Sequence, residues 1–252
     1  MNKSLKHLEE LLELFHLQRS AKALADKAQE AAVQNWSHVQ FLEALLSEEA
    51  VFRHDRVVKM RLHEADIPVL KTMEAFDWTH PTSIPRQIIL NALALDFIEK
   101  KENFILVGPA GVGKTHIAEA IAFAACQREI KTRWVTAAEL VNILSATKAD
   151  HTTEKVLRKF AGYKLLIIDE LGFLPLDKEG SDLFFQLISR RYEQGSVVLT
   201  TNRPFKQWGQ IFNDNTVASA ILDRLVHHCL LARIGGTSYR LRDQKENLDK
   251  PD

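Results

Sequence analysis

Two patterns of hydrophobic and polar positions divide the chain. Up to about residue 75, apolar residues recur at spacings of three and four, as in Leu5, Leu8 and Leu12, which is the period of an amphipathic helix. From residue 104 onward, short apolar runs alternate with amphipathic stretches. Such alternation, with strands this continuously apolar, is typical of a parallel sheet covered by helices on both faces. We therefore expect a small all-helical domain over residues 1–75 and an α/β domain over residues 76–252.

The same pattern places the individual elements. The predicted strands of the α/β domain are 104–108, 132–136, 164–169 and 196–202, and the predicted helices lie near 114–127, 137–147, 154–161 and 180–194. Three prolines and few periodic apolar positions indicate a linker over residues 66–85, followed by one helix over 88–100. Near the C-terminus, CLLARIGG and TSYRLR are typical of a short β-hairpin.

Charge and composition narrow the classes of protein. The 252-residue chain has 33 Lys and Arg residues against 33 Asp and Glu residues, so any nucleic-acid site must be a local basic patch. No uninterrupted apolar run approaches the ~18 residues of a membrane span. The two cysteines, Cys126 and Cys229, have neither metal nor redox spacing, which favours buried thiols in a reducing cytosol. We therefore expect a cytoplasmic protein without a membrane partner.

The stretch FILVGPAGVGKTH, residues 104–116, carries the clearest chemical signal. Its residues 108–115 fit the phosphate loop, placed after a buried strand and before a helix. Glycines let backbone N–H groups wrap a polyphosphate, and the helix N-terminus adds a partial positive charge. We expect Lys114 to contact the β- and γ-phosphates and Thr115 to offer its hydroxyl to Mg²⁺. The predicted cofactor-binding residues are Gly108, Pro109, Ala110, Gly111, Val112, Gly113, Lys114, Thr115 and His116.

Two later strands end in polar residues that suit hydrolysis. KLLIIDE, residues 164–170, ends in Asp169, which would hold Mg²⁺ through its water shell, and Glu170, which would polarise an attacking water. SVVLTTN ends in Asn202, which could reach the γ-phosphate or that water, or could simply cap the turn before Pro204. A Glu that orients water favours transfer of the phosphoryl group to water over transfer to a metabolite.

With these motifs in order, the chain resembles the AAA+ ATPases, and within them the IstB-like transposition helper ATPases, relatives of the DnaC helicase loaders. The resemblance spans the whole length. It rests on LVGPAGVGKTHIAEAIA, LLIIDELGFLPLDKEGSDLFFQLISRRYE, TTNRPFKQWGQIF, and ILDRLVHH followed by SYRLR. It implies ATP and Mg²⁺ as cofactors and an AAA+ fold. Only 28 residues follow Arg224, so we expect the helical lid of the broader AAA+ pattern to be absent or reduced, in agreement with the IstB-like branch.

The resemblance also implies roles for several polar residues. Asn202 is similar to the family's sensor of the γ-phosphate, and Arg224 to its second sensor. An arginine finger that completes the neighbouring subunit's site would be Arg190 or Arg191, with Arg190 preferred, although both could equally be solvated cations at a helix end. A finger acting in trans makes hydrolysis depend on assembly.

Two local basic stretches are candidates for DNA contact. RHDRVVKMR includes Arg53 and Arg56, and KADHTTEKVLRKFAGYK includes Lys155, Arg158 and Lys159 at helical spacing. Each could instead be a solvated helix face. The resemblance favours the second stretch, with contacts to backbone phosphates that depend steeply on salt and little on base sequence.

We therefore hypothesise a DNA-stimulated, Mg-dependent ATPase that forms ATP-dependent homo-oligomers on duplex DNA and recruits or stimulates a transposase during DNA recombination. The helical first domain would dock a partner or DNA, or bury its apolar faces in its own core. The nearest alternative is a DnaC-like loader of a replicative helicase, with the same chemistry and a different partner. A small-molecule kinase is disfavoured because no acceptor pocket motif is visible, and a scaffold without hydrolysis because Glu170 and the paired arginines are present.

Overall fold

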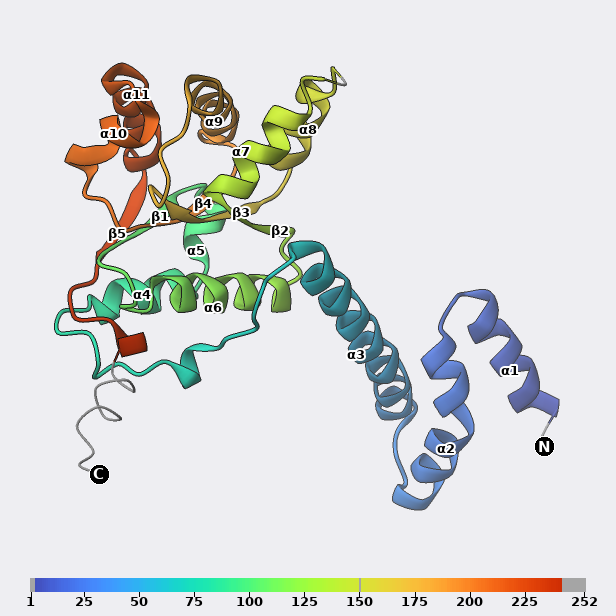
Figure 1. Ribbon diagram of the computed structural model, residues 1–252. Helices are drawn as coiled ribbons and strands as arrows, with labels where there is room; N and C mark the ends of the chain where they lie inside the picture. Colours follow the sequence, from blue (N-terminus) through green and yellow to red (C-terminus); the bar gives the residue numbers. More distant parts are fainter. Residues whose placement is uncertain (1–2, 150, 242–252) are drawn as a thin grey trace, which may run out of the picture. The chain divides into compact units, whose positions relative to one another are not determined.

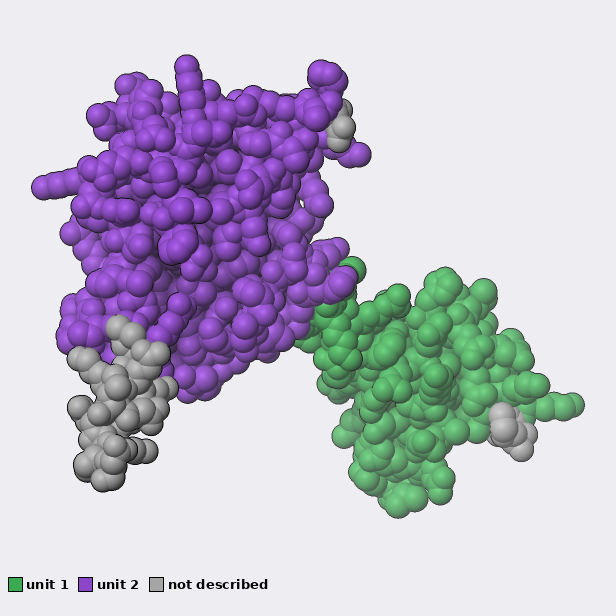
Figure 2. Space-filling view, viewed as in Figure 1, with its two compact units in different colours: residues 1–60 green, residues 61–252 purple. Residues whose placement is uncertain are grey.

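A computed structural model describes residues 3–149 and 151–241 (Figure 1). Contacts divide the chain into two compact units, residues 1–60 and 61–252 (Figure 2). This division falls earlier in the chain than the boundary after residue 75 expected from the sequence. Residues before that boundary pack into the second unit, where Ile67 and Met73 lie against the hydrophobic core.

The first unit consists of helices, as predicted. They are α1 (Lys3–Leu14), α2 (Gln18–Gln34) and α3 (His38–Ala65), the last of which continues beyond residue 60. The Ser20 hydroxyl donates to the carbonyl of Leu45 at 2.9 Å, and the buried Glu49 carboxylate accepts from the Arg19 amide at 2.8 Å. These bonds join α2 to α3, because each links a residue of one helix to a residue of the other.

The second unit is built on a five-stranded parallel sheet. Its strands are β1 (Asn103–Val107), β2 (Thr132–Thr136), β3 (Leu165–Leu171), β4 (Ser196–Thr201) and β5 (Cys229–Arg233). The order across the sheet is β2-β3-β4-β1-β5, and every pair is parallel. The four strands predicted from the sequence are confirmed.

The predicted C-terminal hairpin is wrong. β5 pairs in parallel with β1, with Asn103 opposite Cys229 and Val107 opposite Arg233. The segment that follows forms a 3₁₀ turn, η3 (Tyr239–Leu241), in place of a second strand. The apolar run CLLAR predicts a strand but does not predict which strand pairs with it. The partner here is β1, which is far away in the sequence. No bundle of lid helices follows β5 among the described residues, up to 241.

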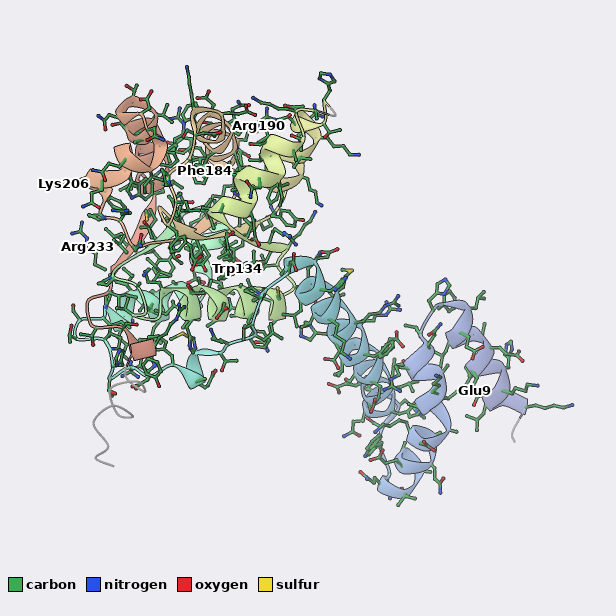
Figure 3. All side chains as sticks on the ribbon, in the orientation of Figure 1. Glu9, Trp134, Phe184, Arg190, Lys206 and Arg233 are labelled. Atoms are coloured by element: carbon green, nitrogen blue, oxygen red, sulfur yellow. The ribbon has the colours of Figure 1, made fainter. Side chains whose placement is uncertain are left out.

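Helices cover both faces of the sheet (Figure 1). One face packs on α4 (Arg86–Leu93), α5 (Asp96–Glu99) and α6 (Lys114–Gln127). The other packs on α7 (Ala137–Ala146), α8 (Thr153–Ala161), α9 (Lys178–Arg191), α10 (Trp208–Phe212) and α11 (Asn215–Val226). Trp134 lies on the α6 side and Phe184 on the α9 side (Figure 3). Along β1, Phe104 and Leu106 enter the core on the α6 side and Ile105 enters the core on the α9 side, as the two-residue period of a strand requires.

The helix expected over residues 88–100 is divided into α4 and α5. Leu95, at φ 66°, adopts the left-handed conformation between them and is buried. The turn brings Phe97 into the core, where its ring lies 6.4 Å from that of Phe104 on β1. Burial of these side chains offsets the local backbone strain at Leu95. Two further 3₁₀ turns are η1 (Met73–Ala75) and η2 (Phe205–Gln207).

Within the described part of the chain, no helix combines the length and the apolar character needed to cross a bilayer.

Candidate phosphate-binding site

The loop between β1 and α6 has a backbone that strongly favours glycine at two positions. Gly111 and Gly113 have φ of 78° and 95°, in the left-handed region. A Cβ on Gly111 would lie 2.1 Å from the Ser238 hydroxyl oxygen, and one on Gly113 would lie 2.6 Å from a ring carbon of Phe76. The loop is therefore held between two other segments of the second unit as well as by its own sequence.

Lys114 opens α6 directly after this loop. Its ammonium group donates to the Pro109 carbonyl at 2.6 Å, so the side chain curls back over its own loop. Burial lowers the pKa of Lys114 below its ordinary value of 10.5, and the carboxylate of Asp169 opposes that shift. A buried ammonium beside a helix N-terminus is a strong point of attachment for a polyanion.

Three oxygen-bearing side chains meet at the carboxyl ends of β3 and β4. The Thr115 hydroxyl lies 3.2 Å from each carboxylate oxygen of Asp169. The Thr200 hydroxyl, at the end of β4, donates to the same carboxylate. Burial raises the pKa of Asp169, and the hydrogen bonds from Thr200 and Thr115 oppose the rise. This set of hard oxygen donors fits Mg²⁺, and a bound cation would favour the ionised carboxylate.

Glu170 is presented to solvent by an irregularity in β3. The register with β4 shifts between Ile168 and Leu171, and Glu170 has φ 60°, which is uncommon for a residue with a side chain. Its amide donates to the Thr200 hydroxyl oxygen at 3.0 Å. Thr200 thus fixes both predicted acids but was not among the predicted site residues. Its place at the tip of the strand beside the acidic one is the signal that could have identified it.

The remaining predicted loop residues are arranged around this centre. Val112 is buried in the core beneath the loop. His116, on α6, shares a hydrogen bond of 2.8 Å with the Thr72 carbonyl, and its ring meets that of Phe76 edge to face at 5.2 Å. Asn202 is exposed just after β4. The amide of Gly108, the first residue of the loop, donates to the carbonyl of Thr201, the residue before Asn202, at 3.2 Å. The structure therefore brings Asn202 to the start of the loop.

The three predicted arginines lie elsewhere in the second unit. Arg190, on α9, makes a two-pronged ion pair with Glu154 of α8, with nitrogen–oxygen distances of 2.9 and 2.6 Å (Figure 3). Arg191 is buried and donates to several backbone carbonyls. Arg224, on α11, stacks on the ring of Phe185 at 4.9 Å. Among the described residues that line the cavity beside the loop, none is one of these arginines.

That cavity holds about 300 Å³. The phosphate loop and the start of α6 form part of the cavity wall. Other parts come from the segment predicted to be a linker, namely Lys71, Phe76, Asp77 and His80, and from the segment predicted to be a hairpin strand, namely Tyr239 and Arg240. The sequence offered no local signal for these residues, because their proximity to the loop arises from folding.

The basic residues predicted to contact DNA differ in which acidic side chains pair with them. On α8, Lys155, Arg158 and Lys159 are exposed, while Leu157 and Phe160 of the same helix face the core. The acid beside them, Glu154, pairs with Arg158, and the two arginine partners lower the pKa of Glu154 to about 2, so it stays ionised. In the first unit, Arg53 pairs with the buried Glu49 at 2.9 Å, and Arg56 is exposed.

Comparison of the sequence with known families gives a match over most of the chain. The family model described as "IstB-like ATP binding protein" matches residues 10–247. The chain is 38% identical to the ATP-binding protein of insertion sequence IS5376 from Geobacillus stearothermophilus, over 97% of this chain and 98% of that one. It is 37% identical to that of IS21 from Pseudomonas aeruginosa, over 95% and 90% of the two chains. It is 39% identical to that of IS232 from Bacillus thuringiensis subsp. berliner, over 98% of this chain and 100% of that one.

Solved structures share the fold of a large part of this chain. A DNA replication initiation factor superposes with a TM-score of 0.57 and 20% identity, covering 72% of this chain and 54% of that one. This chain therefore matches only about half of that initiation factor's length. DnaI superposes with a TM-score of 0.53 and 21% identity, covering 67% of this chain and 89% of that one. At these identities the likeness concerns the fold alone.

Proposed function

This chain belongs to the IstB-like ATP binding protein family, and from that membership we propose that it is an ATPase that helps a transposase act on DNA. The predicted AAA+ fold is confirmed by the five-stranded parallel sheet and the solved structures that resemble it. The observation that carries the proposal is the convergence of the phosphate loop with the oxygens of Thr115, Asp169 and Thr200. Membership in a family of ATP-binding proteins supports ATP as the ligand.

In this proposal the chain's own groups bind and orient the nucleotide. Backbone N–H groups of the loop, the N-terminus of α6 and Lys114 bind the phosphates. Thr115 and Asp169 would hold Mg²⁺, which supplies charge neutralisation at the β- and γ-phosphates. Glu170, placed at the exposed end of β3, orients the attacking water, and Asn202 senses the γ-phosphate.

Completion of the site by a second copy is the next part of the proposal. Arg191 is committed to backbone carbonyls inside its own subunit, which leaves Arg190 as the finger in this motif. Arg190 would exchange its exposed partner Glu154 for a phosphate of the neighbouring subunit. Arg224, the proposed second sensor, also lies outside its own cavity, which favours action across the same interface. ATP would then promote assembly and assembly would permit hydrolysis.

We place the main DNA contact on α8. Its three exposed cations can meet backbone phosphates while its buried face holds the helix against α7 and α9. Arg53 and Arg56 remain a secondary candidate. Arg53 pairs with the buried Glu49, so Arg56 is the cation left there, whereas α8 keeps Lys155 and Lys159 exposed beside Arg158, which pairs with Glu154.

The decisive experiment measures phosphate release with and without duplex DNA over a range of salt concentrations. We expect DNA to raise turnover, Lys114→Ala to abolish nucleotide binding or turnover, and Glu170→Gln to abolish turnover while ATP still binds. A turnover rate that is the same with and without DNA at every salt concentration contradicts the DNA-stimulated mechanism.

The α8 assignment has its own matched control. The double variant Lys155→Ala/Lys159→Ala should weaken DNA binding and reduce the salt dependence of the binding constant, by about 0.9 in slope for each DNA phosphate that is no longer neutralised. The pair Lys100→Ala/Lys101→Ala removes the same charge near the amino ends of the strands and should behave as wild type. Equal effects of the two double variants would refute a DNA contact on α8.

Capture of the cognate transposase, compared with capture of a replicative helicase, separates the proposal from the helicase-loader alternative.

A further inference from the structure

The segment after β5 returns to the phosphate loop along a defined path. Gly235 pairs with Ser83 in an antiparallel bridge, with N–O distances of 3.2 and 2.8 Å in the two directions. Further along, His80 shares a hydrogen bond of 3.0 Å with the Thr237 carbonyl, and its ring meets that of Tyr239 edge to face at 4.8 Å. Residues 80–83 therefore hold residues 235–239 in place beside the loop.

The returning segment contacts the loop directly. The amide of Tyr239 donates to the Gly111 carbonyl at 2.9 Å, and Ser238 occupies the space where Gly111 lacks a side chain. A peptide group is planar and trans, so its C=O and the next residue's N–H point in opposite directions. The bond to the Gly111 carbonyl therefore turns the Val112 amide away from Tyr239. The segment fixes the orientation of one of the donors that a phosphate loop uses.

The same segment brings a second cation to the cavity. Arg240 lines the cavity together with Lys114, and both side chains carry a positive charge. Two cations at one phosphate loop repel each other, and a polyanion between them would convert that repulsion into attraction to both.

We propose that residues Thr237–Arg240 form a working part of the nucleotide site, in which the Tyr239 amide fixes the phosphate loop and Arg240 binds the polyphosphate from within the same subunit. This inference rests on the proposed function and deepens it. It gives Arg240, on the C-terminal segment, a contact with the polyphosphate inside its own subunit, whereas Arg224 on α11 is proposed to act across the subunit interface. Nucleotide binding would then depend on the position of residues Thr237–Arg240, which follow β5.

The first test compares the full-length wild type with Arg240→Ala, Arg240→Lys and the control Lys100→Ala, using ATP and inorganic tripolyphosphate as probes. A charge-assisted hydrogen bond of ordinary strength predicts that Arg240→Ala binds both probes roughly ten- to a hundred-fold more weakly. Arg240→Lys should recover much of the loss, because the charge is retained. Lys100→Ala should bind as wild type, and all variants should unfold at the same temperature without a ligand, because both side chains are exposed.

The outcomes separate the inference from the proposed function. ATP binding by the wild type that is unchanged in Arg240→Ala overturns the inference and leaves the function standing. Weakened ATP binding with unchanged tripolyphosphate binding also overturns it, because Arg240 would then contact the nucleoside. Failure of the wild type to bind ATP refutes the proposed function itself. As a second measurement, ATP should slow hydrogen exchange of the Tyr239 amide in the wild type, and no slowing would count against the segment's role.

Discussion

The neighbouring residues Arg190 and Arg191 should differ sharply when each is replaced by alanine. Arg191 is 1% exposed, and its guanidinium donates to the carbonyls of Phe160 and Tyr163 at 2.7 and 2.8 Å and to that of Ser196 at 2.7 Å. It thereby joins the end of α8 to the start of β4. Burial lowers its pKa to about 10, so the group remains charged at neutral pH.

The expected loss of stability follows from these carbonyls. Leaving a buried acceptor unpaired costs about 1–3 kcal/mol, so three acceptors at the low end give about 3 kcal/mol for Arg191→Ala, before any cavity term. A loss of this size is a large part of the roughly 5–15 kcal/mol that stabilises a typical domain. Arg190→Ala removes a solvent-exposed ion pair with Glu154 and should cost less than about 1 kcal/mol.

Urea unfolding followed by tryptophan fluorescence measures both variants, since Trp134 and Trp208 are buried in the second unit. Phosphate release in the presence of DNA is the second readout. Arg190→Ala should keep wild-type stability and lose turnover, whereas Arg191→Ala should lose stability. The reasoning is refuted if the free energy of unfolding of Arg191→Ala lies within about 1 kcal/mol of the wild-type value, below the expected cost of three unpaired acceptors.

Three further predictions follow from single contacts. Thr200→Val removes the hydroxyl that holds Asp169 and should lower turnover about tenfold or more while ATP still binds; unchanged turnover would contradict a positioning role. Gly113→Ala forces a Cβ to within 2.6 Å of Phe76 at a φ of 95°, so nucleotide binding should be lost in a titration, and tight binding would show that the loop can relax. Burial raises the pKa of Cys126 from 9.0 to about 11, so a disulfide reagent at pH 8 should modify it only after unfolding, and rapid reaction of the native thiol would show that it is accessible. The sign of that shift also means that the stability contributed by the protonated thiol falls as pH rises from 9 toward 11.

The sequence determined the features that depend on neighbours along the chain. Apolar runs such as 104–108 specify buried strands because side chains alternate between two covered faces. The phosphate loop is readable because the left-handed conformations of Gly111 and Gly113 and the start of α6 at Lys114 are all local properties. Asp169 could be proposed as a metal ligand for the same reason, since it ends the predicted strand 164–169, which follows such a loop.

Tertiary structure decided everything that depends on which distant segments meet. The apolar run of β5 does not encode its partner, so the hairpin prediction failed and the strand pairs with β1. Adjacent residues on α9 acquire opposite roles because one side chain faces solvent and the other faces buried carbonyls of α8 and β4, as with Arg190 and Arg191. The cavity wall at His80 and Arg240 exists only because two segments far apart in the sequence close around the loop. Local patterns set backbone conformation, whereas contacts between remote side chains arise only when the whole second unit has packed.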